Sequence, residues 1–138
     1  MNQRTKGHNF ERFVVQKFKE RGFERTNTSR NASRALDNIG IDIVETPFLI
    51  QCKAGYPRGG ISYTKEFINS REQWIKVFGE KTLNKFYSHP YLLFHKHDIP
   101  KGQRNRGDEL TTVTMSMETF FNILTNLEEI KANTLSVL

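Results

Sequence analysis

The sequence contains little of what cross-links a protein or holds it in a membrane. Its 138 residues include one cysteine, Cys52, which excludes an internal disulfide. We find no secretory signal, and no apolar run approaches the roughly 20 residues of a membrane-spanning helix. Internal repeats and low-complexity tracts are also absent. These features predict one soluble domain, residues 1–138, in an intracellular, cytoplasmic setting without membrane contact.

Acidic residues are outnumbered by basic ones. The chain has 21 Lys and Arg against 15 Asp and Glu, a formal net charge of +6. Such an excess favours polyanionic partners, because neutralising phosphates releases condensed counterions. Charge alone carries no information about catalysis. It becomes informative only where the basic residues gather near a site.

Hydrophobic periodicity predicts an α/β fold in which helices flank a central mixed sheet. Apolar spacing predicts a helix over residues 7–21, ended by Gly22, and a second from about 65 to 85 that Gly79 breaks. A third helix opens at Ser116 or Thr119 and ends near Lys131. Strands are expected at 23–26, 41–45, 48–53, 91–94 and 110–115, and residues 27–40 are expected to form a loop.

The chain is organised around residues 41–53, which predict a hairpin with its turn at Thr46 and Pro47. A turn there places Asp42 opposite Gln51, and the two-residue period of a strand puts Lys53 on the same face. The three polar side chains then meet at one end of the hairpin. The opposite face is expected to be apolar and to consist of Ile41, Ile43, Phe48, Ile50 and Cys52.

The spacing of Asp42, Gln51 and Lys53 resembles the motif of the PD-(D/E)xK nuclease superfamily, with Gln51 in place of the usual acid. Residues 6–12 and the helix after them are similar to the opening of archaeal-type Holliday junction resolvases and their viral relatives. Those enzymes carry a metal-site Glu on that helix, which Glu11 matches. The resemblance covers about the first half of the chain and implies a restriction-endonuclease-like core, magnesium-dependent DNA cleavage and, through the viral relatives, the cytoplasm of an infected host cell.

Two acidic positions have competing explanations. Glu11 is expected in the first turn of its helix, where the helix dipole alone favours an acid. Asp37 competes with Asp42 for the role of metal-binding acid, because it also lies just upstream of the first hairpin strand. We prefer Asp42, since it pairs with Gln51, whereas Asp is common in turns for local hydrogen bonding.

The resemblance implies that Glu11, Asp42, the Gln51 amide oxygen and the Cys52 carbonyl bind Mg²⁺, for which Mn²⁺ substitutes. Lys53 then holds the attacking water and steadies the phosphate. Because an amide carries no net charge, Gln51→Glu is expected to tighten metal binding. Gln51 also permits the alternative that catalysis has been lost.

Residues expected to contact DNA are basic or hydroxylic and lie in predicted loops. A solvated loop has the same composition, so this remains the ordinary alternative. The resolvase resemblance favours Ser29 and Arg30, which correspond to a region near the scissile phosphate. The full set is Ser29, Arg30, Arg34, Arg58, Lys101, Arg104 and Arg106.

Three functions are compatible with these observations. The first is a metal-dependent endonuclease that resolves four-way DNA junctions in recombination and repair, as a homodimer because two symmetric nicks need two sites. The second is another nuclease of this superfamily, of restriction or repair type, acting on duplex DNA. The third is a non-catalytic DNA-binding protein on the same fold.

Overall fold

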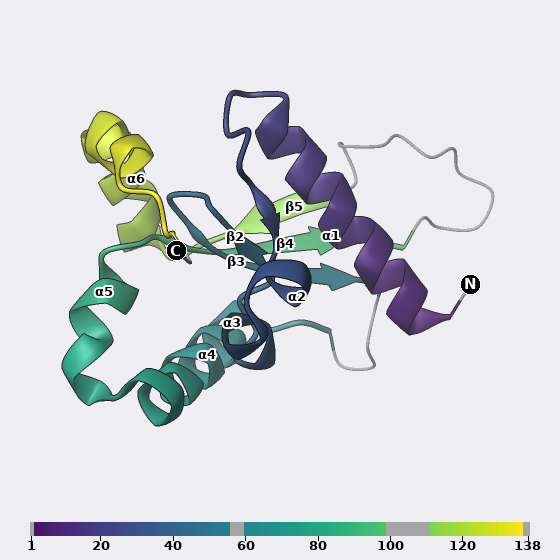
Figure 1. Cartoon of the computed structure of the whole chain (residues 1–138), viewed down its shortest axis with the longest axis horizontal. Helices are drawn as coiled ribbons and strands as arrows, with labels where there is room; N and C mark the ends of the chain where they lie inside the picture. The colour runs from purple at the N-terminus through teal and green to yellow at the C-terminus, as the bar shows by residue number, and fades with distance from the viewer. Residues whose placement is uncertain (1, 56–59, 99–110, 137–138) are drawn as a thin grey trace.

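The computed structural model describes residues 2–55, 60–98 and 111–136 (Figure 1). Five strands form one mixed sheet in the order β1-β2-β3-β4-β5, in which only the β3–β4 pair is parallel among the described strands. The predicted α/β class with a mixed central sheet is confirmed, and the arrangement is compatible with a restriction-endonuclease-like core. The strands are β1 (Asn27–Thr28), β2 (Ile43–Val44), β3 (Leu49–Ala54), β4 (Tyr91–Lys96) and β5 (Thr111–Thr114).

All three predicted helices are present, with shifted ends. Gly79, at φ +88°, ends the long helix as predicted. The Ser116 side chain accepts a hydrogen bond from the Thr119 backbone N–H and so caps the last helix. The helices are α1 (Gln3–Lys19), α2 (Ser29–Ala32), α3 (Arg34–Asn38), α4 (Tyr63–Phe78), α5 (Leu83–Tyr87) and α6 (Met117–Ala132), with a 3₁₀ turn at Glu80–Thr82.

Two predictions about residues 23–40 are wrong. The strand expected at 23–26 lies instead at Asn27–Thr28, because the Thr26 hydroxyl donates to the Phe23 carbonyl and closes a turn there. The following segment is not a loop but folds into α2 and α3. Each of these helices has too few residues to show an apolar period.

The hairpin register is as predicted. Ile43 pairs with Ile50, which aligns Asp42 with Gln51. One face of the hairpin packs beneath α1, where Ile43 and Ile50 join Phe10 of the helix in a buried cluster with Cys52 at its margin. The opposite face contributes Val44 and Leu49 to a second cluster, which also contains Tyr91 of β4 and Trp74 of α4.

Ile41 does not lie where the strand period puts it. It belongs to the cluster under α4 rather than the one under α1, because the strand begins only at Ile43 and the chain turns at Gly40, whose φ is +82°. The positive φ expected at Asn38 or Gly40 is thus found at Gly40. Across the described ranges, no helix combines the length and apolar character needed to span a bilayer.

Candidate active site at the end of the hairpin

Asp42 is fixed by backbone contacts on both sides. Its N–H donates to the Ile50 carbonyl (2.7 Å) and its own carbonyl accepts from the Ser29 N–H (2.8 Å). The Cys52 N–H donates to Asp42 Oδ2 at 2.8 Å. These contacts hold the partly buried Asp42 at the end of the sheet.

Burial raises the pKa of Asp42 to about 7. The Cys52 N–H acts against this shift, while the nearby charges of Glu11 and Asp37 add to it. Lys53 also favours the charged form, but with a smaller effect. The site therefore contains a buried acid whose pKa is raised further by two neighbouring carboxylates, which is typical of a site that binds a cation or transfers a proton.

Glu11 reaches the same region from α1. The helix begins at Gln3, so Glu11 lies beyond the first turn and the expectation that it sits there is wrong. Burial raises the pKa of Glu11 even though the Arg30 guanidinium, 3.6 Å away, favours the charged form. Among the described residues, Glu11 Oε1 is buried and has no hydrogen-bond partner. The dipole of the helix N-terminus does not explain this acid.

Gln51 is 5% exposed, and hydrogen bonds occupy both ends of its amide. Its oxygen accepts from the Tyr91 hydroxyl at 2.5 Å, and its Nε2 donates to Glu66 Oε2 at 3.1 Å. The Tyr91 hydroxyl also contacts Ser70 Oγ at 3.0 Å. The amide thus orients a carboxylate, and its oxygen already accepts a hydrogen bond from Tyr91.

Glu66 is the site residue that sequence reasoning missed. It lies in the first turn of α4, and its Oε1 is 3.8 Å from Lys53 Nζ. A signal was available, because the helix of a crossover between parallel strands begins near the carboxyl end of the first strand. In this chain that end carries Gln51 and Lys53.

Gly40 also limits the space around Gln51. A Cβ atom at Gly40 would lie 3.1 Å from Gln51 Nε2, whereas one at Gly79 meets nothing within 4 Å. Both glycines have positive φ. We expect Gly40→Ala to lower the free energy of unfolding by about 1–3 kcal/mol, and by more than Gly79→Ala, which incurs only the backbone cost. Urea denaturation of the two variants measures the difference, and equal losses would show that the contact with Gln51 contributes nothing.

The donor set fits a small, hard cation. In residues 2–55, 60–98 and 111–136, no three His, Cys, Asp or Glu side chains gather as a complete metal site. Mg²⁺, however, is commonly held by one or two carboxylates and retains several waters. Such a cation would stabilise the charged form of Asp42, whose pKa is raised. It would also give a partner to Glu11 Oε1, which accepts no hydrogen bond.

The remaining predicted residues separate into two groups. Ser29, the first residue of α2, is buried beside Asp42, and Arg30 pairs with Glu11, so both lie at the site. Arg34 is exposed at the start of α3. Asp37 acts on the pKa of both Glu11 and Asp42, so it stays close to the site. Outside the described residues lie Arg58, Lys101, Arg104 and Arg106.

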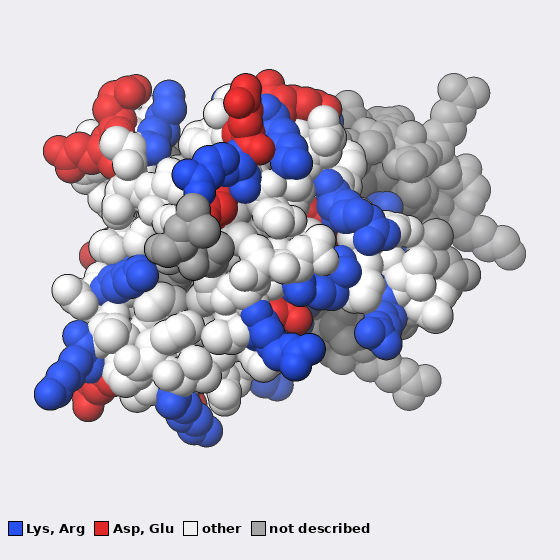
Figure 2. Space-filling view, in the orientation of Figure 1, with Lys and Arg blue, Asp and Glu red and all other residues white. Residues whose placement is uncertain are grey.

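Basic side chains surround this end of the molecule. Figure 2 shows Lys and Arg gathered along the N-terminal half of α1 and over α2. Arg4, Arg12 and Arg34 are exposed there. Lys6 forms an ion pair with Asp98, 2.7 Å away. The positive charge of this surface is complementary to the negative charge of a nucleic-acid backbone.

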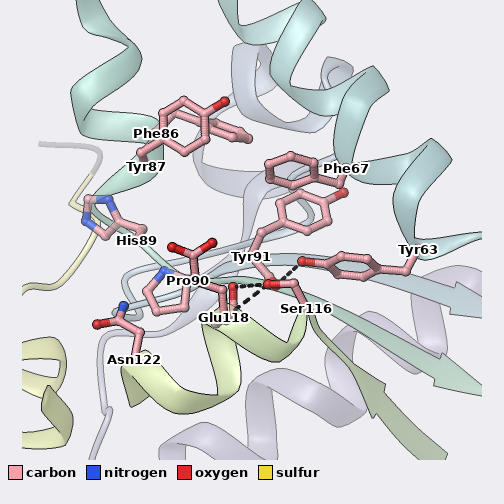
Figure 3. A pocket seen from close by; sticks show the side chains of 11 residues that line it. Tyr63, Phe67, Phe86, Tyr87, His89, Pro90, Tyr91, Ser116, Glu118 and Asn122 are labelled. Atoms are coloured by element: carbon pink, nitrogen blue, oxygen red, sulfur yellow. Dashed lines mark hydrogen bonds between the residues drawn. The ribbon is translucent and has the colours of Figure 1, made fainter. Parts of the chain in front are cut away.

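A separate hollow of about 570 Å³ lies between α4, α5 and the start of α6 (Figure 3). Its lining is mainly aromatic and includes Tyr63, Phe67 and Tyr87. The Tyr63 hydroxyl donates to the Tyr91 carbonyl at 3.1 Å, which ties α4 to β4. Neither Asp42 nor Lys53 lines this hollow, so we place the chemistry at the hairpin end.

No family model, curated protein or solved structure matches the chain. Its function is therefore inferred from its own residues.

Proposed function

We propose that the protein is a metal-dependent, structure-selective DNA endonuclease, most specifically a Holliday junction resolvase. The observation that carries this proposal is the convergence of Glu11 and Asp42 with the Lys53–Glu66 pair beside a basic surface. Hydrolysis of a phosphodiester needs a cation, an activated water and a positive charge at the phosphate. These residues are of the types that supply each of them.

Glu11 and Asp42 are the residues that would hold Mg²⁺ or Mn²⁺, with the Cys52 carbonyl as an additional oxygen. The bound cation supplies positive charge at the phosphate and lowers the pKa of water. Asp42 is kept in place by the Cys52 N–H. Its location at the sheet end means that it need not reorganise when the substrate arrives.

Lys53 and Glu66 act as a pair. In this proposal the ammonium of Lys53 donates to a phosphate oxygen, and Glu66, whose Oε1 lies 3.8 Å from Lys53 Nζ, limits the positions of that ammonium. Glu66 itself is oriented by the amide of Gln51. In this proposal Glu66 supplies the carboxylate that the superfamily motif carries two residues before the lysine, and Gln51 positions it.

The basic surface over α1 and α2 provides the DNA contacts. Arg12 and Arg34 are exposed and suited to phosphates, whereas Arg30 lies deeper, against Glu11. Contacts of this kind position a duplex without reading its sequence. They favour recognition of a DNA shape, such as a four-way junction.

A non-catalytic DNA-binding protein is the second candidate. The observation in its favour is that position 51 carries an uncharged amide whose oxygen already accepts from the Tyr91 hydroxyl. If Glu66 does not supply the carboxylate missing at position 51, the protein would still bind DNA through its basic surface but would not cleave it. Lys53 distinguishes the two candidates.

We expect Lys53→Ala to lower the rate of Mg²⁺-dependent cleavage of a labelled four-way junction by about 100-fold or more, since it removes a charge that acts on the transition state. Junction affinity should change only a few-fold, because many other phosphate contacts remain. Lys81→Ala, an exposed lysine of the 3₁₀ turn, is the matched control and should cleave normally.

The substrates in this assay separate the alternatives. Paired nicks in the junction alone support the resolvase. Cleavage of linear duplex instead indicates another type of nuclease. Junction binding without cleavage in the natural protein and in both variants indicates the DNA-binding protein.

A further inference from the structure

Helix α6 presents apolar side chains to solvent. Met117, Phe120, Phe121, Leu124 and Leu127 are 45–77% exposed. The residues of α6 that turn inward are others, of which Ile130 is buried and Thr119, Ile123 and Asn126 are partly buried. Among the described residues, the fold therefore covers an inner, mixed face of the helix and leaves its outer apolar face exposed. We call the five exposed residues the outer stripe.

The outer stripe is at the upper end of the apolar patches that monomers expose. With five large side chains roughly half exposed, it offers on the order of 600 Å² of apolar surface, taking about 150–250 Å² for each as for an aromatic residue. The largest apolar patch on a typical monomer is about 300–600 Å². Two such stripes packed together would remove about 1,200 Å², the lower limit of a standard stable interface.

Charge argues against a nucleic acid or an anionic membrane as the partner. The helix carries Glu118, Glu128 and Glu129 against a single basic residue, Lys131. The basic surface of the molecule lies elsewhere, over α1 and α2 (Figure 2). A polyanion would therefore bind that surface in preference to α6.

The outer stripe is complementary to itself. From Met117 to Leu124 its residues follow the i, i+3, i+4, i+7 spacing of one helix face. When two copies pack antiparallel about an axis between Phe120 and Phe121, the aromatic pairs meet at the centre, and Met117 faces Leu124 at both ends.

We propose that the outer stripe of α6 is the interface of a homodimer in which two α6 helices pack antiparallel. The same patch is used twice, as two-fold symmetry requires. The interface does not depend on the nuclease proposal. If that proposal holds, the interface also determines where the two active sites of the dimer lie. Because α6 and the N-terminal half of α1 lie at opposite ends of the molecule, the two basic surfaces would lie away from the interface (Figure 1).

Sedimentation velocity of the full chain tests the interface. We expect the natural protein to sediment as a dimer and Phe121→Glu to weaken dimerisation about 30-fold or more, as loss of a central aromatic contact does. Val77→Glu on α4, where the native side chain is 48% exposed, is the matched control and should remain dimeric. Both positions are exposed, and circular dichroism confirms that each variant is folded. A monomeric natural protein, or a dimer that Phe121→Glu leaves intact, overturns the proposal.

A mixing experiment tests the antiparallel arrangement. Met117→Lys and Leu124→Glu should each be monomeric alone, because each sets charged groups against apolar side chains twice. When they are mixed, the introduced ammonium of one chain meets the introduced carboxylate of the other, and the native Leu124 meets the native Met117, so a heterodimer should form. Failure of the mixture to dimerise overturns the antiparallel arrangement. Cleavage activity has no part in either readout, so failure of the nuclease proposal leaves both results interpretable.

Discussion

Replacing Asp42 with Asn is expected to stabilise the metal-free protein at pH 8 while it abolishes cleavage. Burial raises the pKa of Asp42 to about 7, so ionising it in the folded chain costs free energy. The amide has nearly the same shape and still accepts from the Cys52 N–H. Taking about 1.36 kcal/mol per pKa unit, the gain at pH 8 is on the order of 2–4 kcal/mol.

The sign of the pH dependence follows from the same shift. Between about pH 4 and pH 7 the folded chain keeps a proton that the unfolded chain has released, so the contribution of Asp42 to stability is full below about pH 4, falls as the pH rises and is lost above about pH 7. Urea denaturation of the metal-free natural protein should show this fall, and Asp42→Asn should reduce it. A variant less stable than the natural protein at pH 8, with an unchanged slope, would contradict the assignment.

Mg²⁺ should reverse the order of stability. Because a ligand that binds only the folded state stabilises it, Mg²⁺ should raise the melting temperature of the natural protein. Asp42→Asn should show a much smaller rise. Asp98→Asn, which changes an exposed acid paired with Lys6, should respond to Mg²⁺ as the natural protein does.

Exchanging the functional groups of Gln51 and Glu66 is the second change with a large expected effect. Glu66→Gln alone should lower junction cleavage by about 100-fold or more, because it removes the carboxylate beside Lys53. Gln51→Glu alone sets two carboxylates against each other in place of a 3.1 Å hydrogen bond. That variant should bind Mg²⁺ more tightly, as expected from the motif, but lose stability without the metal.

The double variant should recover most of the activity. With a carboxylate at position 51 and an amide at position 66, an amide again faces a carboxylate. The Tyr91 hydroxyl still has an acceptor, which is then the carboxylate at position 51. Cleavage rates of the natural protein, both single variants and the double variant form a cycle whose non-additivity measures the coupling of the pair. If the double variant loses as much as the two single losses combined, Glu66 does not replace an acid at position 51.

The hairpin is the part of the fold that sequence predicts best. Two apolar runs around Thr46 and Pro47 allow one register that buries a face, and that register is found between Ile43 and Ile50. The cap of α6 is predicted equally well, because a Ser before an apolar run is a local signal. Local patterns thus give the placement of Asp42, Gln51 and Lys53.

The contacts that complete the site are not local. Glu66 reaches Gln51 only because α4 returns across the sheet after β3, and Tyr91 reaches it from the neighbouring parallel strand β4. The helix dipole alone explains an acid in the first turn of a helix, so this position in itself gives no separate signal that Glu66 has a second role. Side-chain contacts across elements depend on packing, which apolar periodicity does not describe.

The length of the turn between β2 and β3 is constrained for two reasons at once. The register that packs Ile43 and Ile50 beneath α1 also sets the Asp42 carboxyl against the Cys52 N–H. Adding one residue to the turn would reverse the faces of a strand and so would disturb the core and the acid together. Insertions accepted elsewhere on the surface would be rejected here even in a descendant that no longer needed the chemistry. The position of residue 42 against the Cys52 N–H would therefore persist even after an acid there had lost its use.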